Sequence, residues 1–191
     1  MRRLGTIPDD THNWSDRLFE GTDSFLPKNK QEEYTKNLDK CTNFKEVFQL
    51  VKQSVKESLK AERVGLMLFL ADLPYNVGAY HQVGTNNIVM NRVLLNHVLE
   101  TSEETRQANS FIYSILTHEY LHALGYLKEE DTRALTYRIS RDTFGDEHLA
   151  TRMAASNPWQ YIKPPHRDIN EVQRPLSVVR DFEQPPFGII S

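Results

Sequence analysis

Apolar residues recur at helical spacing soon after the first forty positions of the chain. They share one face of a helix and are Phe44, Val47, Phe48, Val51, Val55 and Leu59. Asn43 and Glu46 have the spacing of an N-cap and its partner three residues later, so the pattern predicts a helix over residues 44–61. Residues 1–40 show no sustained period, and we expect an irregular segment there in which only residues 31–38 could form a short helix.

Three strands are predicted in the next block of the chain. Residues 63–72 alternate Leu and Val with other apolar residues, so both faces are apolar and a central position in a sheet is expected. Two shorter strands follow at about 78–83 and 86–91, and the turn between them contains Gly84-Thr85-Asn86.

Helical patterns fill the chain from there to about residue 155. The predicted helices span about 92–99, 102–124, 129–143 and 146–155. Asn91 can cap the first of them, Thr101 and Glu104 form a capping box for the second, and Gly125 ends it. Because the strands form one block between helices, the pattern indicates an α+β fold.

The composition changes after Asn157, where six of the nine prolines lie. We therefore divide the chain into an irregular N-terminal segment over residues 1–40, a folded domain over 41–156 and an extended Pro-rich tail over 157–191. One hypothesis is that the tail lies across the active-site cleft as a plug. The alternatives are a packing strap or a partner-binding arm.

Charge and cysteine content exclude several classes of protein. The 23 Lys and Arg against 26 Asp and Glu give a net charge of −3, which does not suit a surface that follows phosphates, so a nucleic-acid partner is not expected. The longest apolar run, Val64 to Ala71, is too short to cross a bilayer. A single cysteine, Cys41, and the lack of an apolar stretch after the first residues favour a cytoplasmic protein without a secretory signal.

The clearest chemical signal is the sequence His118-Glu119-Tyr120-Leu121-His122, which has the form HExxH. Two histidines four residues apart lie one turn apart on one helix face, so both rings can reach one zinc ion at about 2.0–2.1 Å. Glu119 stands about 100° around the helix from His118, where it can reach a metal-bound water as general base without being a ligand.

This motif resembles that of the zincin metallopeptidases, in which two motif histidines and a third downstream residue bind zinc. The resemblance covers the motif helix closely and residues 44–155 more loosely. It implies a small sheet packed on the HExxH helix, zinc ligation by His118 and His122, and the general-base role for Glu119. Position 128 is Lys where the metzincin subgroup has its third His, so the chain is not a standard metzincin. The same departure counts against a bacterial endoribonuclease family that also requires His there.

Four residues remain as candidates for the third zinc ligand. His148 is favoured because the break at Gly145 lets the chain return after a helix that runs roughly 22 Å away from the motif. Asp142 lies 20 residues after His122, as the glutamate ligand does in thermolysin-like enzymes. The weaker alternatives are Glu130 and Glu147.

The sequence thus predicts a zinc-dependent peptidase that acts on a peptide or protein, with the oligomeric state left open. Residues 84–91 are expected to form the sheet edge that pairs with extended substrate. The candidates for stabilising the oxyanion are Tyr126, Tyr137 and His81. The alternative functions are a zincin-like binding module with little turnover and a metal-dependent RNA hydrolase.

Overall fold

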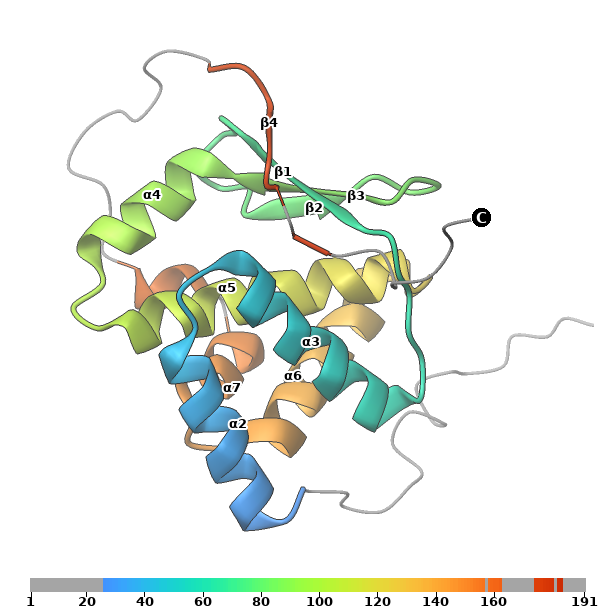
Figure 1. The fold of residues 1–191 in the computed structure, drawn as a ribbon, viewed down its shortest axis with the longest axis vertical. Helices are drawn as coiled ribbons and strands as arrows, with labels where there is room; N and C mark the ends of the chain where they lie inside the picture. Colours follow the sequence, from blue (N-terminus) through green and yellow to red (C-terminus); the bar gives the residue numbers. More distant parts are fainter. Residues whose placement is uncertain (1–25, 157, 163–173, 181, 184–191) are drawn as a thin grey trace, which may run out of the picture.

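The computed structural model describes residues 26–156, 158–162, 174–180 and 182–183. Within them the chain forms six α-helices and one four-stranded mixed sheet, and the sheet covers one side of the helical layer (Figure 1). The α+β fold that the sequence predicts is therefore confirmed. None of the described helices combines the length and the apolar character needed to cross a bilayer.

The helices lie close to their predicted positions. They are α2 Lys28–Lys40, α3 Phe44–Leu59, α4 Arg92–Thr101, α5 Thr105–Ala123, α6 Glu129–Phe144 and α7 Leu149–Ala155, followed by a 3₁₀ turn at Pro158–Tyr161. Asn43 caps α3 as expected, because its side chain accepts the Glu46 N–H at 3.0 Å. The capping box expected before α5 is wrong: Thr101 belongs to α4, where its hydroxyl donates to the His97 carbonyl, and the Glu104 side chain makes no capping bond.

Helix α2 occupies a region that we expected to be irregular. Its Tyr34 and Leu38 are buried in the main hydrophobic cluster, and the Tyr34 ring meets the Phe144 ring edge-on at 6.2 Å. The folded domain therefore begins before residue 41. Residues 1–25 lie outside the described part of the chain.

The sheet has the strand order β2-β3-β1-β4, with β1 Met67–Ala71, β2 Ala79–His81, β3 Asn87–Asn91 and β4 Ser177–Val178. Strand β1 is interior as predicted and pairs in parallel with β3. Residues 87–91 are not an edge, because β3 pairs with β1 on one side and antiparallel with β2 on the other. The edge strand on this side is β2, so the sheet edge that we expected at residues 84–91 lies instead at residues 79–81.

Asn91 ties the sheet to the loop that follows β1. Its side-chain oxygen accepts the N–H groups of α4's first turn, and its amide nitrogen donates to the carbonyls of Leu73, Pro74 and Val77. The side chain is fully buried. One residue thus caps α4 and fixes the loop that leads into β2.

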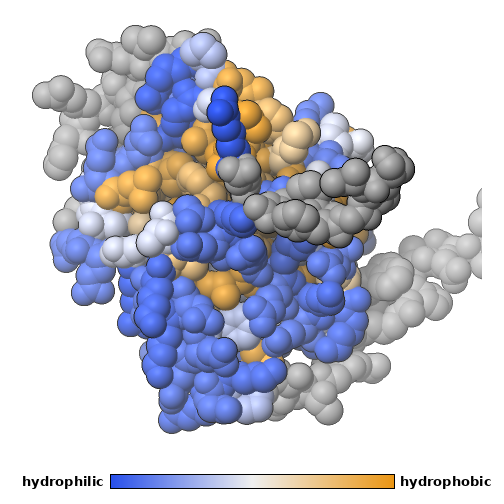
Figure 2. All heavy atoms as spheres, in the orientation of Figure 1, coloured by the Kyte–Doolittle hydropathy of each residue, from blue (hydrophilic) through white to orange (hydrophobic). Residues whose placement is uncertain are grey.

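Helix α5 lies at the centre of the core. Tyr113, Leu116, Tyr120 and Leu121 on this helix are wholly buried and pack with residues of α3 and of the sheet's inner face. The Tyr120 hydroxyl also bonds both backbone groups of Arg63, which fixes the motif helix beneath the start of β1. In Figure 2 the side chains over the sheet and α4 are largely hydrophobic, whereas those over α2 and α3 are mostly hydrophilic.

The described part of the tail is a strap on the sheet edge far from β2. Strand β4 pairs antiparallel with β1, and Phe182 stacks on Phe48 of α3 with ring centroids 4.3 Å apart. Glu183 forms an ion pair with Lys52 and accepts the Leu66 N–H. Residues 174–180 and 182–183 therefore form a packing strap, as one of the alternatives for the tail predicted, and this part of the tail is not a plug across the cleft. The rest of the tail hypothesis falls on residues that the structure does not describe.

Candidate metal centre

The two motif histidines meet on the exposed face of α5 near its end. Their Nε2 atoms are 3.1 Å apart, and their rings are nearly perpendicular, at 87°. This follows from the four-residue spacing, which stacks side chains one helical turn apart on one face. The two Nε2 atoms therefore converge on one position, as metal ligation by both histidines requires.

Glu129 completes a three-residue cluster with them. Its carboxylate oxygens lie 3.1 Å from His122 Nε2 and 3.4 Å from His118 Nε2. The three ligand atoms lie within 4.8 Å of one another, and this is the group suited to a metal ion among the residues that the structure describes. Gly125, with φ +103°, lets the chain reverse after α5, so α6 begins with Glu129 beside the histidines.

The spacing of these atoms suits a tetrahedral zinc site. Ligands at about 2.0–2.1 Å from zinc in tetrahedral geometry lie about 3.3 Å from one another. The two Nε2 atoms are 3.1 Å apart, Glu129 Oε1 lies 3.1 Å from His122 Nε2, and the other carboxylate oxygen, Oε2, lies 3.4 Å from His118 Nε2, all close to that value. Two imidazoles and one carboxylate are also a donor set that zinc accepts in catalytic sites. The residues present therefore fit a zinc ion.

A hydrogen bond at His122 and burial at His118 favour metal binding through the Nε2 atoms. The Tyr126 carbonyl lies 2.7 Å from His122 Nδ1, so that nitrogen carries the proton and Nε2 is left with a lone pair directed at the cluster. The Thr132 hydroxyl donates to the same carbonyl. Burial, together with the neighbouring His122, lowers the pKa of His118 below its usual range.

Glu119 is the most unusual polar group of the site. Its side chain is 5% exposed, and one carboxylate oxygen accepts the His81 backbone N–H. The other oxygen, Oε2, is buried and has no hydrogen-bond partner within the described part of the chain. Burial raises the pKa of Glu119 to about 8. A buried carboxylate left half-satisfied is costly, and such groups concentrate at functional sites.

A cleft of about 910 Å³ opens beside this cluster. Its walls are the loop and strand at residues 76–79, the exposed faces of α5 and α6, and residues 153–156 and 158. His118, Glu119 and Glu129 all line it. The volume is at the upper end of the range for ligand pockets, so the cleft can hold several residues of a peptide.

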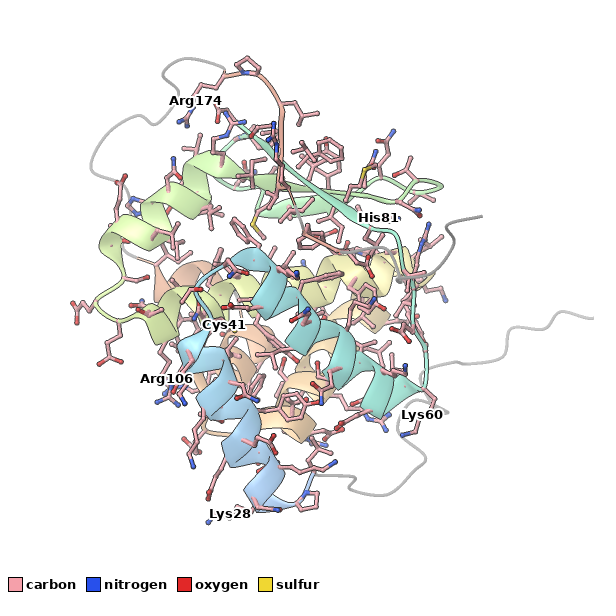
Figure 3. The ribbon with its side chains drawn as sticks, in the orientation of Figure 1. Lys28, Cys41, Lys60, His81, Arg106 and Arg174 are labelled. Carbon is pink, nitrogen blue, oxygen red and sulfur yellow. The ribbon has the colours of Figure 1, made fainter. Side chains whose placement is uncertain are left out.

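The free edge of β2 faces this cleft. The Gly78 carbonyl and the Gln82 N–H pair with β3, so alternate residues 79 and 81 direct their backbone groups outward. Glu119 takes the outward N–H of His81, and Figure 3 shows His81 on the side of the sheet toward α5. The backbone groups of Ala79, which also lines the cleft, remain available to an extended chain.

The structure does not bring His148 to the cluster. His148 is the N-cap of α7: its Nδ1 accepts the Ala150 N–H at 3.2 Å, and its ring stacks on Phe144 at 4.5 Å. Phe144 packs on Tyr113, in the part of α5 before the motif. The physical reason is that the turn at Gly145 returns the chain along the N-terminal half of α5, and His148 is placed there as a buried structural residue.

The remaining third-ligand candidates also lie elsewhere. Asp142 is buried and forms ion pairs with Arg138 and Arg141 at 3.7 and 3.6 Å. Glu130 and Glu147 are exposed and do not belong to the cluster. The sequence analysis missed Glu129 because nothing local marks it as a ligand. The available signal was the short turn after Gly125, which forces the first residue of the next helix back beside His122.

The three candidates for stabilising an oxyanion differ in position. Tyr137 lines the cleft. Tyr126 contributes its carbonyl to His122. His81 donates its backbone N–H to Glu119, and its ring Nδ1 lies 3.0 Å from the Asn87 carbonyl.

Comparisons with known proteins do not identify the chain. No protein-family model, no curated protein and no solved structure matched it. The functional argument therefore depends on the site itself.

Proposed function

We propose that this protein is a zinc-dependent peptidase in which His118, His122 and Glu129 hold the metal and Glu119 is the general base. The observation that carries the proposal is the convergence of three suitable ligand atoms beside a buried carboxylate whose Oε2 has no described partner. The ligand set differs from our sequence prediction in one residue, because Glu129 replaces His148. The HExxH motif in this setting remains similar to that of the zincins.

When bound, zinc supplies a Lewis acid that polarises a peptide carbonyl and makes a coordinated water easier to deprotonate. Glu119 is adjacent to His118 on α5 and lines the same cleft, so with a metal bound its Oε2 would accept that proton and later return it to the leaving amine. The His81 N–H fixes the other oxygen and so orients the carboxylate. A nearby dication favours the charged form of Glu119, which opposes the pKa-raising effect of burial.

The edge of β2 is the natural place for the substrate backbone. An extended peptide that pairs with Ala79 would run along the cleft wall past His118 and Glu119. The loop at residues 76–78 and its anchor, Asn91, would then set the distance between the substrate and the metal. A rigid edge of this kind supports hydrolysis, because catalysis depends on accurate placement of the carbonyl.

The test is the variant Glu119→Gln in zinc-loaded protein. The amide keeps the shape and the His81 bond but cannot accept the proton, so we expect zinc content to be unchanged and peptide turnover to fall by 10²-fold or more, as is typical for loss of a general base. Glu130→Gln, on the exposed start of α6, is the matched control and should keep full activity. Cleavage by Glu119→Gln at the parental rate would refute the mechanism. Absence of turnover in the parental protein, with zinc bound, would favour a binding module instead.

A further inference from the structure

One side chain in the cleft has no role in the mechanism above. Among the cleft-lining residues that the structure describes, only Arg133 carries a permanent positive charge. It follows Glu129 by four residues on α6, so the two side chains lie on the same helix face. An arginine beside three candidate metal ligands is expected to face a negatively charged group.

Glu129 does not satisfy this arginine. Arg133 Nε lies 3.7 Å from Glu129 Oε2, which is beyond hydrogen-bond distance, and its side chain is 76% exposed. A single exposed pair at this spacing contributes only a few tenths of a kcal/mol. The guanidinium has five N–H donors in a planar fork, and this pair holds none of them in a hydrogen bond.

The position of Arg133 relative to the metal ligands is informative. The same oxygen, Glu129 Oε2, lies 3.4 Å from His118 Nε2 and 3.7 Å from Arg133 Nε. The guanidinium and the metal-binding nitrogen therefore flank a single carboxylate oxygen. When Glu129 binds a metal ion, its charge is shared with the ion, and the attraction that it exerts on Arg133 weakens. A second anion in the cleft would then be the better partner for the arginine.

We propose that Arg133 binds a carboxylate of the substrate and gives the enzyme a preference for peptides with a carboxylate next to the hydrolysed bond. This inference rests on the proposed function. Arginine suits the task because its fork matches a carboxylate with two parallel hydrogen bonds. The carboxylate can belong to an acidic side chain or to a free C-terminus, because both present the same planar group to the guanidinium fork.

The other charges of the cleft do not supply this preference. With zinc bound, the dication offsets the negative charges of Glu119 and Glu129, so Arg133 is the charge among the described lining residues that distinguishes a substrate carboxylate from a neutral amide. Removal of the Arg133 charge should therefore weaken the binding of carboxylate peptides and leave amide peptides almost unaffected.

The test measures binding, so it does not depend on turnover. Zinc-loaded Glu119→Gln protein is titrated against fluorescein-labelled alanine-based hexapeptides in two series. The first compares Glu with Gln at each internal position, and the second compares a free with an amidated C-terminus. We expect at least one acid peptide to bind about tenfold more tightly than its amide, and the series in which this occurs identifies the source of the carboxylate.

The Arg133→Gln substitution in the same background should reduce that ratio to about one. Arg106→Gln is the matched control, because Arg106 is also an exposed arginine in a long ion pair, with Asp39 at 3.5 Å, and lies near the opposite end of α5 (Figure 3). Equal binding of acids and amides would overturn the inference, as would an acid preference that survives Arg133→Gln. An equal loss for both peptide classes would also overturn it, because Arg133 would then bind a backbone carbonyl.

The same peptides, offered to zinc-loaded protein with Glu119 intact, test the proposed function separately. If none is cleaved, the peptidase proposal fails, and the binding comparison still decides whether Arg133 recognises carboxylates.

Discussion

The substitution Glu129→Gln tests the identity of the third metal ligand. Glutamine has nearly the same shape as glutamate, but its neutral amide oxygen is a much weaker zinc ligand than a carboxylate. Glu129 is 61% exposed and contributes no core packing, so the fold should survive the change. A change in zinc affinity can then be attributed to the lost ligand.

The expected size of the effect follows from the cluster geometry. Glu129 oxygens lie 3.1 and 3.4 Å from the two imidazole nitrogens, a spacing at which the carboxylate would contact a zinc ion bound by both. Loss of a group that only orients a ligand costs 10–100-fold in affinity, and loss of a direct ligand should reach the upper end of that range or exceed it. We therefore expect zinc to bind at least about 100-fold more weakly, which corresponds to about 2.7 kcal/mol.

The assay is a competition titration of zinc against a chromophoric chelator at pH 7. Glu130→Gln removes the adjacent exposed carboxylate and controls for net charge. His148→Asn removes the ligand that the sequence favoured, while Asn preserves the N-cap of α7. Both controls should bind zinc within a fewfold of the parental protein. A large loss of zinc in His148→Asn together with full retention in Glu129→Gln would refute the assignment.

Three further predictions concern stability, each measured by urea unfolding. Burial lowers the pKa of His148 from 6.5 to about 4, so the unfolded chain binds the proton more readily than the folded protein. The folded protein should therefore lose about 3 kcal/mol of stability as the pH falls from 6.5 to about 4, and His148→Asn should flatten the dependence of stability on pH in this range. Phe182→Ala should cost about 3 kcal/mol by removing a buried ring from the strap, whereas the exposed Leu176→Ala should change stability by less than about 0.5 kcal/mol. Asn91→Ala should cost more than about 2 kcal/mol, because it removes a helix cap and leaves three loop carbonyls without their donor.

The parts of the structure that the sequence predicted well are those with local signals. The helix that carries His118 and His122 is encoded by apolar spacing and by Gly125, and an HExxH motif on such a helix fixes its own geometry. Asn43 likewise identified the start of α3 through Glu46, three residues later. Each of these features depends on residues within a few positions of one another, so tertiary packing is not needed to recognise it.

The features that were missed depend on how distant segments pack. Gly145 was correctly predicted to end α6. The chain leaves this glycine along the first half of α5, so His148 lies away from the motif. Strand order decides whether β2 or β3 is the edge, and alternation within each strand carries no information on that order. Strand β4 has two residues in a Pro-rich region, so no periodicity could reveal its pairing with β1.

We propose that the cluster on α5 and α6 holds one catalytic zinc ion. Elemental analysis tests this on purified protein that has been stripped with a chelator, reloaded with zinc and freed of excess metal by gel filtration. We expect about one zinc per parental chain, essentially none in His118→Ala, and about one in His148→Asn. A parental chain that retains no zinc, or a His118→Ala chain that retains a full equivalent, would refute the zinc site.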